Sequence, residues 1–143
     1  MAEEEAAERR IALRSNSRSK ALAGFLGFTG AGIIRYWVGW LRKGNLKEGL
    51  RTVEGDSYIA LHVAAEVLMG LASVVAAIGL ATGRAWATIA GAFALGMVAY
   101  STINALGWAL RNDRKLVVPL LGALGGSLRG LAALFRRQEP PEQ

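Results

Sequence analysis

The stretch YIALHVAAEVLMGLASVVAAIGL, residues 58–80, decides the fold because it is almost wholly apolar, with His62 and Glu66 as its main exceptions. A helix needs about 20 predominantly apolar residues to cross a bilayer, and this stretch supplies them without a break. A second stretch of the same kind follows the short turn TGR and covers residues 85–110. Together they predict an antiparallel pair of transmembrane helices.

Two further apolar blocks flank this pair. Residues 21–41 contain Arg35 near their end, and residues 116–135 are rich in glycine and contain Arg129. We therefore predict an all-α integral membrane helical bundle, a single domain over residues 21–135. Three or two spans are the alternative, if the outer blocks lie in the interface or re-enter. The expected spans are 21–41, 58–82, 85–110 and 116–135.

The two ends of the chain are polar. Residues 1–20 form an amphipathic polar segment, in which acids precede arginines, as suits a short surface helix over residues 2–14. Residues 15–19, with three serines, are expected to be a polar hinge. The acidic start gives no sign of a signal peptide. Residues 136–143 are expected to be a disordered tail.

Composition narrows the function classes. Hydrophobic residues make up 52% of the 143-residue chain, the net charge is +6, and cysteine is absent. Disulfides, thiolate metal sites and cysteine nucleophiles are therefore excluded. Because the cations flank the apolar blocks, they fit contact with anionic lipid headgroups better than nucleic-acid binding.

The cations do not decide the orientation, because four spans would place nearly equal numbers on each side, as in a dual-topology protein. One side would hold Arg9, Arg10, Arg14, Arg18, Lys20, Arg84, Arg136 and Arg137, and the other Arg42, Lys43, Lys47, Arg51, Arg111, Arg114 and Lys115. Aromatic residues at the block ends predict an interfacial belt. Its members are Trp37, Trp40, Tyr58, Trp86 and Trp108.

Polar residues of the first three spans are expected at one depth. Folding the central helices about residues 83–84 pairs positions whose numbers sum to about 167, so Glu66 lies level with Ser101. Polar side chains are expensive when they face lipid, which favours turning them toward each other. We call the predicted set the polar cluster; its members are Arg35, His62, Glu66, Tyr100 and Asn104.

Three roles for the polar cluster stay open. It can be a buried network that only fixes helix register. It can line an ion or proton path, with Glu66 and His62 exchanging protons and Arg35 attracting an anion. It can also bind a lipid-soluble ligand such as a quinone through His62 or Tyr100.

Catalysis and metal binding have little support. One histidine and one acid within the spans supply too few ligands for a usual zinc site. Hydroxyl groups in membrane helices usually bond back to their own backbone, which we expect of Ser101 and Thr102. The sequence leans against an enzyme, and no metal or cofactor is expected.

Glycines at every fourth position of the last block form a helix-packing stripe of Gly122, Gly126 and Gly130. Such a stripe lets another backbone approach closely, either from a partner subunit or from within the same bundle.

Two resemblances follow from local motifs. Residues 61–108 resemble uncharacterised small multi-pass membrane proteins that share a His-x-x-x-Glu start, a Gly-Arg turn and a GM-x-x-Y-x-x-x-N helix. This resemblance implies that the polar cluster is a family feature. The stretch GFTGAGIIRY, residues 27–36, is similar to the opening helix of the fluoride channel family, which would imply a dual-topology channel.

These observations predict a multi-pass protein of the cell membrane. Its expected role is an accessory, scaffold or self-assembling subunit of a larger membrane complex. The alternatives are a small homo-oligomeric channel or transporter using Arg35, His62 and Glu66, and a pocket for a lipid-soluble ligand. The expected partners are the bilayer and other copies or subunits, with no nucleic acid.

Overall fold

The structure, a computed structural model, describes the backbone of residues 2–44 and 56–136 and the side chains of residues 16–44 and 60–136. Within these ranges every regular element is a helix. The predicted disordered tail, Lys47, Arg51 and the side chains of residues 2–15 lie outside the described parts. The elements are α1 (Ala2–Arg42), α3 (Asp56–Ala81), α4 (Ala87–Asn112), the 3-10 helix η1 (Arg114–Leu116) and α5 (Val117–Phe135).

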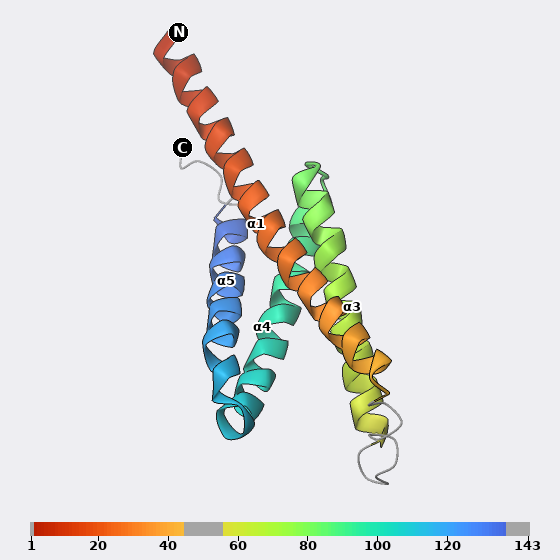
Figure 1. Ribbon diagram of the computed structural model, residues 1–143. Coiled ribbons are helices and arrows are strands. Elements are labelled where there is room, and N and C mark those ends of the chain that lie inside the picture. Colours follow the sequence, from red (N-terminus) through yellow and green to blue (C-terminus); the bar gives the residue numbers. More distant parts are fainter. Residues whose placement is uncertain (1, 45–55, 137–143) are drawn as a thin grey trace.

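Helix α1 is one unbroken helix of 41 residues. The prediction of a hinge at residues 15–19 is wrong, because the helix runs through them. Serine and asparagine each disfavour a helix by only about 0.5 kcal/mol, and residues 15–19 contain no proline or glycine to end it. In Figure 1 the first part of α1 extends well beyond the other helices.

The turn between α3 and α4 is set by Gly83. Its φ of +67° lies in the left-handed region, which glycine enters without steric penalty. The backbone N–H of Arg84 donates to the carbonyl of Gly79 at 2.9 Å, and that of Gly83 donates to Leu80 at 3.4 Å. These two bonds form a Schellman motif, which ends α3 and returns the chain antiparallel as α4.

Asp113 separates α4 from the last span. Its backbone is extended, with φ −150° and ψ 91°, and its carboxylate accepts a hydrogen bond from the backbone N–H of Lys115 at 3.1 Å. This cap starts η1, which continues directly into α5. The sharp bend lets α5 return alongside α4.

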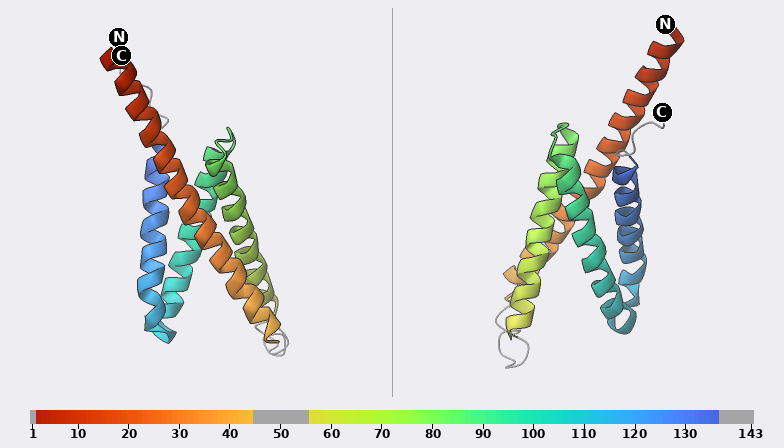
Figure 2. Two further views of the ribbon diagram at one scale, coloured as in Figure 1. Left: turned by 45° about the horizontal axis from the view of Figure 1, so that its top comes forward. Right: turned by 180° about the vertical axis from the view of Figure 1, so that it is seen from behind.

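Helices α3, α4 and α5 form an antiparallel layer, and α1 crosses one side of that layer diagonally (Figure 1). Helix α1 packs mainly on α3, and its contacts with α4 and α5 are few. The view from behind shows α4 at the centre of the other side of the layer (Figure 2). The buried core lies where all four helices meet. It contains Ala23, Leu26, Ala76, Ala77, Leu80, Ala87, Ala94, Leu95 and Leu134.

Helices α1 and α3 cross with their backbones almost in contact. A Cβ atom on Gly30 would lie 2.6 Å from the carbonyl oxygen of Gly70, and one on Gly70 would lie 3.1 Å from the carbonyl oxygen of Gly30. Close backbone approach through small residues is a usual way for helices to associate in lipid. The crossing sets an antiparallel register, in which a residue of α1 and the residue of α3 that faces it have numbers that sum to about 100.

Four helices are long and apolar enough to cross a membrane. Their candidate spans are Asn16–Arg42, Ala60–Ala81, Ala87–Asn112 and Arg114–Phe135. The exposed surface between the span ends carries large apolar side chains, including Phe28 at 84% and Ile89 at 75% exposure. The all-helical architecture is therefore as the sequence predicted, and four of its helices have the length and apolar composition of membrane spans.

Candidate functional site

Glu66 forms the one described side-chain bond between α3 and α4. The Ser101 hydroxyl donates to Oε1 of Glu66, in a partly buried position. The two residue numbers sum to 167, so the predicted register of the central pair is confirmed. Glu66 lies ten residues from the start of α3 at Asp56, about 15 Å along the helix axis at 1.5 Å per residue. The hydroxyl thus gives this carboxyl group a hydrogen-bond partner deep within the span.

The hydroxyl groups of the spans behave in two ways. Those of Ser73, Thr102 and Ser127 donate to the carbonyl four residues earlier, at 2.6–2.8 Å. The prediction of such backbone bonding is therefore confirmed for Thr102. For Ser101 it is wrong, because its hydroxyl donates to the carboxyl group of Glu66 at the same level.

His62 faces α1. Its ring lies 5.6 Å from the ring of Trp37, nearly perpendicular to it at 81°. This edge-to-face geometry is favourable for aromatic rings, and it joins α1 to α3 one turn away from Glu66. His62 and Glu66 thus share a face of α3, as the i, i+4 spacing requires, but they contact residues of different helices.

The other members of the predicted polar cluster point outward. By the register of the Gly30–Gly70 crossing, Arg35 lies level with Glu66, yet its side chain is exposed. Tyr100 is 73% exposed and Asn104 is exposed as well. Glu66, by contrast, is half-buried beside Ser101. Three of the five predicted members therefore lie on the outside of the bundle at about the depth of Glu66.

Helix α4 has a continuous exposed face. Its members recur at three- and four-residue spacing, so they lie on one side of the helix. A Cβ on either glycine of this face would meet nothing within 4 Å. We call this surface the outer face of α4; it consists of Phe93, Gly96, Tyr100, Asn104 and Gly107. The spacing of Gly96, Tyr100 and Asn104 was a signal for it that our sequence analysis did not use.

The glycine stripe of α5 is used largely within the chain. A Cβ on Gly126 would lie 2.5 Å from the ring of Phe25 of α1. One on Gly130 would lie 2.8 Å from Leu22 and 3.0 Å from Leu95. A Cβ on Gly122 would meet nothing within 4 Å. Two of the three glycines therefore make room for side chains of α1 and α4.

The aromatic residues of the predicted belt lie at the span ends. Trp37 and Trp40 stack edge to face at 5.6 Å near the end of α1, and Trp108 is 58% exposed near the end of α4. Trp86 stands at the opposite end, in the turn before α4, and is 47% exposed. The side chain of Tyr58 lies outside the described residues.

The described residues show no set of three or more His, Cys, Asp and Glu side chains placed to hold a metal ion. What the described site offers chemically is a carboxyl–hydroxyl pair within the bundle and an amide and a phenol on its outside. Such groups bind protons, hydrogen-bonding ligands or other helices.

One family model matches the chain. It is described as Domain of unknown function (DUF8058) and covers residues 16–126, which is well over half of the chain. The match begins where the first candidate span begins, and it includes both the Glu66–Ser101 pair and the outer face of α4. No curated protein and no solved structure matches the chain.

Proposed function

The chain belongs to the DUF8058 family, and we propose that it acts as a self-assembling subunit of a complex in the cell membrane. The outer face of α4 would be the contact surface, and a second copy of the chain would be its partner. The observation that carries this proposal is the exposed amide of Asn104.

Asn104 is difficult to leave in contact with lipid. It lies eight residues before the end of α4 at Asn112, about 12 Å along the axis. An amide without a hydrogen-bond partner in hydrocarbon costs on the order of 4 kcal/mol, and its short side chain cannot reach the headgroups. A carboxamide both donates and accepts, so Asn104 can pair with Asn104 of a second copy across a two-fold axis.

The neighbouring residues favour such a contact. Gly96 and Gly107 carry no side chain, which lets another helix backbone come close. Tyr100 supplies a large ring between them, with a hydroxyl that can donate to the second helix. Helix α4 itself lies at the centre of the side of the layer that α1 leaves uncovered (Figure 2).

Disulfide crosslinking in native membranes tests the proposal. The chain has no cysteine, so Asn104→Cys introduces a single thiol without background. Val118→Cys is the control, because Val118 is 76% exposed and lies on α5, outside the outer face of α4. We expect mild oxidation to yield a homodimer from Asn104→Cys and little from Val118→Cys.

Native mass spectrometry of the unmodified chain, released gently from its membrane, complements this test. We expect a homodimer or higher homo-oligomer. Asn104→Leu should raise the dissociation constant of this oligomer about tenfold, because a hydrogen bond between membrane helices contributes about 1–2 kcal/mol. A complex with a different protein would instead make the chain an accessory or scaffold subunit. Equal crosslinking of both cysteine variants would contradict the assignment of this face.

A second candidate function is supported by Glu66. An ionisable residue within a membrane bundle is characteristic of proton and ion pathways. If Glu66 carries protons, Glu66→Gln should abolish pH-driven flux into proteoliposomes while leaving the oligomer intact. If Glu66→Gln changes only thermal stability, the Glu66–Ser101 pair is a structural bond between α3 and α4.

A further inference from the structure

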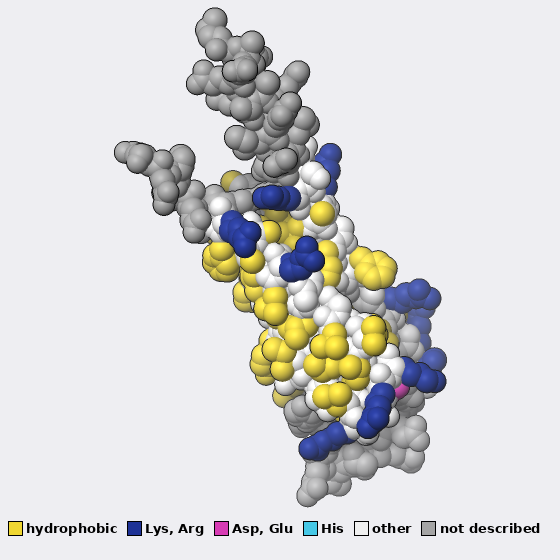
Figure 3. All heavy atoms as spheres, turned by 90° about the vertical axis from the view of Figure 1, so that its left-hand side faces the viewer, with side chains coloured by type: hydrophobic (Ala, Val, Ile, Leu, Met, Phe, Trp, Pro, Cys, Tyr) yellow, Lys and Arg dark blue, Asp and Glu magenta, His cyan; other side chains and the backbone are white. Residues whose placement is uncertain are grey.

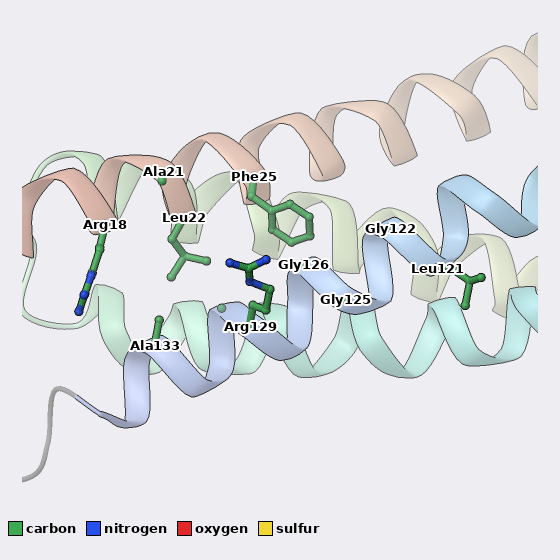
Figure 4. Close-up of a pocket in the computed structure, with 11 residues that line it drawn as sticks. Arg18, Ala21, Leu22, Phe25, Leu121, Gly122, Gly125, Gly126, Arg129 and Ala133 are labelled. Carbon is green, nitrogen blue, oxygen red and sulfur yellow. The ribbon is translucent and has the colours of Figure 1, made fainter.

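A groove runs between α1 and α5 on the side of the molecule away from the Glu66–Ser101 pair. Its volume is about 590 Å³ and it is open to the surroundings. Leu22 and Phe25 of α1 form one wall (Figure 4). Gly122, Gly125 and Gly126 of α5 leave the opposite side without side chains. The result is a slot of apolar character along the outside of the bundle.

Two arginines line the half of this groove that is nearer Ala133, with Arg18 at its end and Arg129 beside Phe25 (Figure 4). Figure 4 shows the guanidinium group of Arg129 reaching from α5 toward Leu22 and Phe25, while Arg18 reaches from α1 toward Ala133. The described lining of the groove contains these two cations and no acid. On this side of the molecule, Lys and Arg side chains lie both above and below a largely hydrophobic surface (Figure 3).

The depth of the two arginines matches a headgroup region. Arg18 is two residues inside the first candidate span, which begins at Asn16. Arg129 is six residues before the end of α5 at Phe135, about 9 Å along the axis. The nearest acid that precedes Arg18 in α1 is Glu8, ten residues or about 15 Å away along the helix.

We propose that the groove binds one anionic phospholipid, with its phosphate between Arg18 and Arg129 and an acyl chain in the slot beside Gly122 and Gly125. Guanidinium groups bind phosphate oxygens in bidentate geometry, and basic pockets between transmembrane helices are suited to anionic headgroups. The absence of side chains at the two glycines leaves room for the chain directly below the phosphate. A pair of arginines alone, or an apolar slot alone, would not favour a lipid. In this groove the two arginines and the apolar slot are continuous.

The experiment is native mass spectrometry of the full chain titrated with phosphatidylglycerol, phosphatidylcholine or inorganic phosphate. The test variant is Arg18→Gln/Arg129→Gln. The matched control is Arg84→Gln/Arg114→Gln, which also removes two exposed cations but from outside the groove. A third variant, Gly122→Leu, fills the slot and keeps both arginines; a Cβ there meets nothing within 4 Å, so the fold has room for it.

We expect one tightly held phosphatidylglycerol per chain. Its affinity should fall about 30-fold in Arg18→Gln/Arg129→Gln, since each cation near a membrane surface attracts an anionic lipid by a factor of about five, and it should be unchanged in the control. Gly122→Leu should weaken phosphatidylglycerol binding as well.

Three results would overturn the proposal. Equal loss in both double variants would mean that net charge alone attracts the lipid. Equal binding of inorganic phosphate would indicate a soluble anion instead of a lipid. A dimer without bound lipid that dissociates in Gly122→Leu would indicate that a second copy fills the groove.

Discussion

The crossing of α1 and α3 makes a quantitative prediction at Gly30. In Gly30→Ala the new Cβ would lie 2.6 Å from the carbonyl oxygen of Gly70 and 3.0 Å from Cβ of Ser73. Ordinary contact begins at 3.4 Å, so the helices must separate locally by up to about 0.8 Å, which is 3.4 minus 2.6. A gap of that size forfeits a quarter to a half of each dispersion contact along the crossing. Overpacking of this kind costs about 1–3 kcal/mol of unfolding free energy.

Gly32→Ala is the matched control, since it adds the same methyl group to the same helix and its Cβ meets nothing within 4 Å. Replacing a helical glycine with alanine there should stabilise by about 0.5–1 kcal/mol. The two variants should therefore differ by about 1.5–4 kcal/mol.

The assay is reversible unfolding in mixed micelles titrated with sodium dodecyl sulfate, followed by tryptophan fluorescence. Trp37 reports on the crossing directly, because its ring packs on His62 of α3 at 5.6 Å. Gly30→Ala should unfold at a lower detergent fraction than the wild type, and Gly32→Ala at an equal or higher one. Equal midpoints for the two variants would refute the close approach of α1 and α3.

Three further changes have defined outcomes. Gly83→Ala places a side chain at φ +67° and should lower the melting temperature by the equivalent of about 1–2 kcal/mol, whereas an unchanged melting temperature would exclude the Schellman turn. Ser101→Ala removes the described hydroxyl partner of Glu66 and should cost about 1–3 kcal/mol in the same detergent titration; a neutral result would mean that the carboxyl group finds another partner. Gly126→Leu should destabilise the monomer through its clash with Phe25 while Gly122→Leu does not, and circular dichroism melts of the pair would show the difference.

The number of long apolar helices and the approximate limits of α3 and α4 follow from the sequence, because a helix that crosses lipid must be long and apolar. The predicted span of residues 58–82 is realised as α3 (Asp56–Ala81), and that of residues 85–110 as α4 (Ala87–Asn112). A short turn allows only one antiparallel register, so the level of Glu66 and Ser101 could be predicted as well.

The rotation of each helix about its axis could not be predicted. In a soluble helix the apolar stripe identifies the buried face, but α3 and α4 are apolar on all sides and give little such signal. The prediction therefore placed Tyr100 with Glu66, while the neighbouring Ser101 makes the contact. The crossing at Gly30 and Gly70 could not be predicted either, because the chain contains many other glycines that could have made such a contact.

Because α1 is one unbroken helix, its crossing with α3 divides it into two rigid segments of unequal length. From the crossing at Gly30, about 18 Å of helix run to Arg42 and about 42 Å run back to Ala2, for 12 and 28 residues at 1.5 Å each. If α1 tilts about Gly30 so that its Arg42 end moves by about 1 Å, its Ala2 end moves by about 2 Å in the opposite direction. A small displacement at the tryptophan-rich end of α1 would thereby be enlarged at its Ala2 end.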